Sequence, residues 1–146
     1  MRKAACKVRQ AACGVGRRYS VDDADRSLVL VRRIVADIVT DYARLVDLQE
    51  AAEAARSPAG VQAARAEVAQ LVERLQRALE ELEFLGLELK DWSVGVVDFP
   101  GVADGREIRL TWRLGDQAIR SWHEIHCPTL QSIETIPIVD AQTVER

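Results

Sequence analysis

An apolar repeat at positions 61–85 is the feature that most constrains the fold of this chain. Apolar residues recur there at alternating steps of three and four, and Gly86 follows at once. This spacing places all of them along one face of an α-helix, and glycine commonly ends a helix. We therefore predict a helix over residues 60–86, with Val72 and Leu79 beside the seam as a second apolar edge. The repeat consists of Val61, Ala64, Val68, Leu71, Leu75, Ala78, Leu82 and Leu85.

A second apolar stripe at helical spacing comes earlier in the chain. Ser20 can cap the start of a helix, and Asp22 and Asp23 would place negative charge in its first turn. Pro58 and Gly60 interrupt the pattern before the second helix. We predict a first helix over residues 20–56 and a coiled-coil-like antiparallel hairpin. The stripe consists of Ala24, Leu28, Val31, Val35, Ile38, Tyr42 and Leu45.

After Gly86 the apolar period changes from helical spacing to alternation. Residues 92–99, 107–113 and 118–124 have the pattern of β-strands, separated by turn residues at 100–105 and 114–116. Short connections require antiparallel neighbours. We therefore predict an α+β fold in which a three-stranded meander over 88–124 packs one face against the hairpin.

The hydrophobic and charged fractions, 48% and 29%, are those of one globular domain, which we assign to residues 20–146. Residues 1–19 hold six basic side chains and no acid, so we expect a flexible basic extension. Residues 125–146 form a C-terminal tail with a weak strand pattern at 136–139. The basic residues are Arg2, Lys3, Lys7, Arg9, Arg17 and Arg18.

Charge and cysteine usage restrict the partners of this chain and its compartment. Without the six positive charges of the extension, the net charge of −3 becomes −9 for residues 20–146, which disfavours nucleic acid as a partner except through the extension. No apolar run approaches the roughly 18 residues of a membrane span, and the N-terminus lacks a secretory pattern. The three cysteines, Cys6, Cys13 and Cys127, are an odd number, so we expect reduced thiols in the cytoplasm.

Four short strings make the order of these parts recognisable. Tyr19–Ala24 opens the first helix, Val97–Pro100 lies in the first predicted strand, and Trp112–Gly115 and Trp122–Glu124 follow. Together they resemble the bacterial family known as domain of unknown function 2203, over roughly residues 19–124. The resemblance implies a helical pair followed by a small β-region, and it implies no activity.

Two positions depart from the pattern of that family. Thr111 stands where members usually have a cysteine, and residues 125–130 replace a segment that usually contains Gly-Phe and Gly-x-Arg. A family site that depends on that arginine would be absent or rebuilt in this chain.

The polar cluster at 123–127 holds both histidines of the protein. If the turns pair Trp112 with Ile119 and Val96 with Leu110, Asp98 and His123 flank Ile108 on the core-side face. A carboxylate beside an imidazole can serve acid–base catalysis or orient a metal ligand, with Glu124 as a further catalytic candidate. His126 and Cys127 could complete a site for zinc or another transition metal, together with Asp98 and His123. The alternative is that Asp98 caps a turn and His123 is a hydrogen-bonded strand residue.

Two functions remain open at this point. The first is an interaction module whose hairpin pairs with a second copy or with another helical protein, because its apolar edges exceed what one small sheet covers. The second is a metal-binding or acid–base enzyme with its site around Asp98 and His123.

Overall fold

The computed structural model describes residues 17–136, and these form an α+β fold of two helices followed by a five-stranded sheet. Helix α2 spans Val21–Ala54 and helix α3 spans Pro58–Phe84. The strands are β1 (Glu88–Asp91), β2 (Val96–Ala103), β3 (Arg106–Arg113), β4 (Ser121–Glu124) and β5 (Cys127–Ser132), and a 3₁₀ turn, η1, follows at Ile133–Thr135. Most of the basic extension, with Cys6 and Cys13, and positions 137–139 of the weak strand pattern lie outside the described residues.

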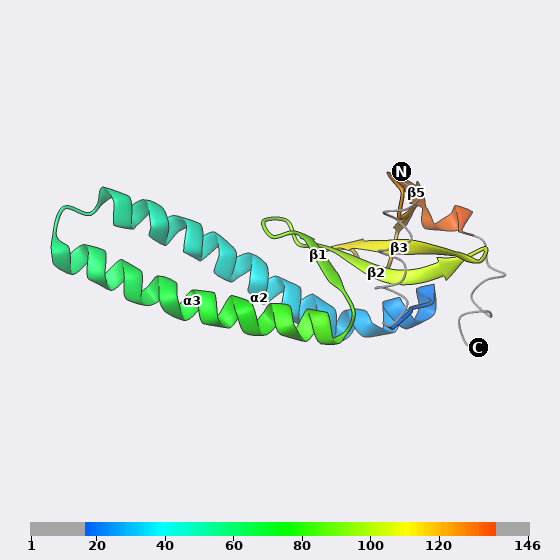
Figure 1. The fold of residues 1–146 in the computed structure, drawn as a ribbon, viewed down its shortest axis with the longest axis horizontal. Coiled ribbons are helices and arrows are strands. Elements are labelled where there is room, and N and C mark those ends of the chain that lie inside the picture. Colours follow the sequence, from blue (N-terminus) through cyan, green and yellow to red (C-terminus); the bar gives the residue numbers. More distant parts are fainter. Residues whose placement is uncertain (1–16, 137–146) are drawn as a thin grey trace.

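The helices begin and end where the sequence predicts, within two residues. The Ser20 hydroxyl accepts a hydrogen bond from the Asp23 amide, and the Ser57 hydroxyl accepts one from the Gly60 amide. Pro58 therefore opens α3, where its missing N–H costs no hydrogen bond. Figure 1 shows the helices side by side and antiparallel, with the sheet against one end of the hairpin and the interhelical connection projecting away from it.

The sheet has five antiparallel strands in the order β1-β2-β3-β4-β5, so the prediction of three strands is wrong. Strand β1 was missed because it has only four residues, and β5 lies in the segment predicted to be a tail. Trp92 lies in a turn rather than in a strand. The Asp91 carboxylate accepts hydrogen bonds from the amides of Ser93 and Val94 and closes that turn.

Pro100 and Gly101 lie inside β2 rather than in a turn. The reversal uses Asp104 and Gly105 alone, both at positive φ, as a two-residue hairpin with a type I′ twist requires. Strand β2 tolerates the proline because its carbonyl accepts from the Tyr19 amide at 2.8 Å, on the side away from β3, so no ladder donor is lost. A Cβ atom on Gly101 would lie 2.9 Å from the Tyr19 carbonyl oxygen.

The strand register differs from the prediction on both sides of β3. Leu110 pairs with Trp122 and Arg109 with His123, one residue away from the expected alignment, while Asp98 pairs with Thr111. The connection between β3 and β4 runs through residues 114–120 instead of forming a tight turn. Because side chains alternate along a strand, an odd shift exchanges the two faces of the sheet.

One hydrophobic core lies between the hairpin and the sheet. Tyr19, at the end of the predicted extension, belongs to it: the side chain is buried, packs edge-on against Phe99, and donates a hydrogen bond to the Leu85 carbonyl at 2.6 Å. Trp112 and Trp122 are also buried there. Among residues 17–136, neither helix is apolar over a stretch long enough to cross a bilayer.

Candidate functional site

Asp98 and His123 meet on the outer face of the sheet, opposite the hairpin. Asp98 Oδ2 lies 3.1 Å from His123 Nε2, diagonally across β3. The Asp98 side chain is 3% exposed and that of His123 is 14% exposed. The sequence therefore identified the two residues as neighbours but placed them on the wrong face, on either side of Ile108 instead of in direct contact.

Each polar atom of this pair has a partner. The Thr111 hydroxyl donates to Asp98 Oδ1 at 2.8 Å, and His123 Nδ1 lies 3.0 Å from the Glu124 carbonyl oxygen. A carbonyl oxygen only accepts, and so does a carboxylate. A ring with two N–H groups satisfies both acceptors, whereas a neutral ring satisfies one of them.

A second group of charged side chains lies along the same face of the sheet, beside this pair. Arg109, opposite His123, lies 3.9 Å from Glu107 Oε2, and Arg18 reaches Glu107 Oε1 at 3.5 Å. The side chains of Glu107 and Arg109 are only 11% and 14% exposed. The two contacts of the ring, to Asp98 Oδ2 and to the Glu124 carbonyl, hold the His123 imidazole in one orientation, with the charged group of Arg18, Glu107 and Arg109 beside it.

The other candidates lie elsewhere. The Glu124 side chain is on the opposite face, 3.4 Å from Arg106, so only its backbone carbonyl joins the network. His126 and Cys127, at the β4–β5 turn, are exposed. Within the described part of the chain, no group of three or more His, Cys, Asp or Glu side chains is arranged to hold a metal ion.

The sequence did not indicate Thr111, Arg109 and Glu107 as members of this polar face. Their alternation with Ile108 and Leu110 places them on the face opposite the hairpin, and such a face is commonly exposed to water in an antiparallel sheet. The alternation shows which face a side chain lies on, but it does not show that the outer face of this sheet is partly buried.

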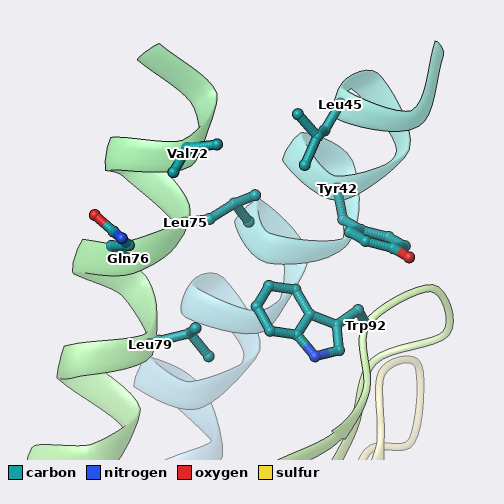
Figure 2. A pocket seen from close by; sticks show the side chains of 7 residues that line it. All are labelled: Tyr42, Leu45, Val72, Leu75, Gln76, Leu79 and Trp92. Carbon is teal, nitrogen blue, oxygen red and sulfur yellow. The ribbon is translucent and has the colours of Figure 1, made fainter. Parts of the chain in front are cut away.

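A second candidate site lies on the hairpin. We call it the Trp92 groove, a cavity of about 330 Å³ between α2 and α3. Figure 2 shows the Trp92 indole reaching from the β1–β2 turn over this groove, beside Tyr42 and Leu79. The rings of Tyr42 and Trp92 lie 5.7 Å apart. The groove is lined by Tyr42, Leu45, Val72, Leu75, Gln76, Leu79 and Trp92.

Comparison with known proteins identifies the family. Neither the curated proteins nor the solved structures include a match. The family model described as "Uncharacterized conserved protein (DUF2203)" matches residues 17–130, which include both helices and nearly the whole sheet. The chain therefore belongs to the DUF2203 family.

Proposed function

We propose that this protein is an interaction module that self-associates through the α2–α3 hairpin. The observation that supports this proposal is the exposure of large apolar side chains along both helices. Val29 is 72% exposed and Phe84 84% exposed. Leu30, Val46 and Val72 are between 37% and 46% exposed. Leu30 and Phe84 line one groove between the two helices, and monomeric proteins rarely leave a large contiguous apolar patch without a partner.

Dimensions explain why one sheet leaves apolar surface on the hairpin. At about 1.5 Å per residue, α2 is about 51 Å long and α3 about 40 Å, whereas an eight-residue strand spans about 27 Å. Leu48, Ala64 and Leu71 are buried but do not belong to the core between the hairpin and the sheet, so the two helices cover them. The apolar residues beside this seam are the ones left for a partner.

A second copy is the partner we propose. Two hairpins related by a two-fold axis form a four-helix arrangement, in which the same surface on each copy covers the other. We place this assembly in the cytoplasm, where the three cysteines would stay reduced.

Light scattering on the full chain at micromolar concentration tests the proposal. We expect about twice the chain mass of 16.3 kDa. A cooperatively melting protein that keeps the single-chain mass over that concentration range would contradict self-association.

A second proposal, an acid–base or metal site around Asp98 and His123, is supported by the 3.1 Å contact between these side chains. Elemental analysis of protein purified without chelator tests the metal form of this proposal. Zinc or another transition metal near one equivalent per chain would favour it, and protein without metal whose melting is unchanged by added zinc would count against it.

A further inference from the structure

The hairpin has a second groove, which we call the Phe84 groove, with a volume of about 510 Å³. It lies where α3 ends beside the first half of α2, and neither Trp92 nor any other residue of the Trp92 groove lines it. Its lining includes Leu30 and Ile34 from α2, and Arg77, Glu80, Glu81 and Phe84 from α3.

This groove combines a protruding aromatic side chain with a hollow. Phe84, at the last position of α3, is 84% exposed, and Leu30 on the neighbouring helix is 46% exposed. An exposed phenylalanine gains most when its ring is removed from water, and buried aromatic side chains dominate the energy of many interfaces. In a two-fold dimer, a projection and a hollow on one surface are each present twice and can fill one another.

The charged rim of the groove is complementary to itself. Arg77 lines the groove together with two carboxylates, Glu80 and Glu81, which follow it three and four residues later on α3. Within residues 17–136, none of the three takes part in an ion pair, so each is available to a partner. Two antiparallel copies of this rim can place the cation of each against the carboxylates of the other, which fixes orientation and disfavours other alignments.

The Trp92 groove is the weaker candidate for the dimer contact. The indole of Trp92 already lies over it (Figure 2). Leu79 is half-buried. Its lining has no charged side chain that could orient a second copy. The second apolar edge that the sequence predicts, at Val72 and Leu79, is therefore covered in part by Trp92 of the same chain.

The side of the hairpin that carries the Phe84 groove is large enough to supply one half of a dimer interface. One side of the hairpin is about 40 Å long, the length of α3, and about 20 Å wide for two adjacent helices. That gives a projected area of about 800 Å², which is what each partner contributes to a stable interface of standard size.

We propose that a second copy of this chain docks on the Phe84 groove about a two-fold axis, with Phe84 of each copy in the groove of the other. This inference rests on the proposed self-association and names its surface. Arg77 of each copy pairs with Glu80 or Glu81 of the other, and the Trp92 groove stays outside the contact.

Three sets of variants test this surface by light scattering and sedimentation of the full chain. Phe84→Gln should raise the dimer dissociation constant at least about tenfold, because aromatic residues at an interface centre have effects of this order. It should leave the melting of the monomer nearly unchanged, since Phe84 contributes little to the core. Val72→Glu with Leu79→Glu changes the Trp92 groove instead and should leave the dimer intact, because that groove lies outside the proposed contact.

Charge exchange gives the sharper result. Arg77→Glu should weaken the dimer, and adding Glu81→Arg should restore it, because the rim becomes complementary again with reversed signs. Arg65→Glu, the same change at an exposed position of α3 far from the groove, is the control.

The outcomes separate this inference from the proposal on which it rests. A wild-type dimer that dissociates with Val72→Glu and Leu79→Glu, but not with Phe84→Gln, would overturn the Phe84 surface and leave self-association intact. Loss of association with Arg77→Glu that neither Glu81→Arg nor Glu80→Arg restores would also overturn it. A wild-type monomer would remove both proposals.

Discussion

Replacing Asp98 by alanine tests whether the outer-face network stabilises the sheet. The carboxylate is 3% exposed and accepts hydrogen bonds from Thr111 and from His123. A hydrogen bond to a charged group contributes about 1.5–3 kcal/mol to stability. Loss of both bonds therefore removes about 3–6 kcal/mol before any compensation.

Two effects reduce that loss. The variant no longer has to bury a carboxylate, and the partly exposed Thr111 and His123 can regain hydrogen bonds to water. We expect a net decrease of about 2–3 kcal/mol in the free energy of unfolding. At about 4 °C per kcal/mol for a domain of this size, the melting temperature should fall by about 8–12 °C.

Urea denaturation of a double-mutant cycle measures the effect. Thr111→Val removes the hydroxyl with little change of shape and should cost about 1.5 kcal/mol in the wild-type background, because its bond goes to a charged group. In the Asp98→Ala background it should cost almost nothing, which gives a coupling energy of at least about 1 kcal/mol. Asp37→Ala, at an exposed position of α2, is the control.

Two results would refute this reasoning. Additive costs for Asp98→Ala and Thr111→Val would show that the hydrogen bond between them contributes nothing. A variant that is as stable as the wild type, or more stable, would indicate that the carboxylate is kept for chemistry at the expense of stability, as active-site residues often are.

Three further predictions concern the extension, the metal and the response to acid. A chain that begins at Arg17 should melt within about 4 °C of the full chain, because Ser20 caps α2 and Arg18 keeps its contact with Glu107; a larger fall in calorimetry would show that the preceding residues are packed. His123→Ala should lower any zinc content more than His126→Ala does, because His126 lies in an exposed turn, and equal losses would contradict this. The amides of Val94 and Ser93 and the Ser93 hydroxyl lower the pKa of Asp91, so ionised Asp91 favours the folded state. The stability advantage of the wild type over Asp91→Asn should be complete above about pH 5 and shrink toward pH 2, and a constant difference over that range would contradict it.

The contact between Asp98 and His123 shows how a prediction can succeed despite a wrong register. Both predicted registers were displaced by an odd number of residues, the one between β2 and β3 by three and the one between β3 and β4 by one. Each displacement moved its residue from the inner face to the outer face. The two residues therefore stayed on one face and near β3.

The sequence by itself determined the two helices and the change to strands. Helix positions follow from a repeat of three and four residues and from caps such as Ser20 and Ser57, whose hydrogen bonds reach three residues along the chain. These are local properties, so the chain carries them without reference to its fold. The α+β class followed from the change of period after Gly86.

The tertiary structure alone decided the strand register, which strand residues face the hairpin, and which part of the hairpin is covered by the rest of the chain. The sequence predicts that Trp92 begins a strand. In the structure it lies over the hairpin instead, where its ring meets that of Tyr42, fifty positions earlier. Strand β5 forms because β4 offers it an open edge, and Pro100 stays within β2 because Tyr19 approaches its carbonyl. Such contacts join distant parts of the chain, and the local pattern of apolar and polar residues does not record which of them will meet.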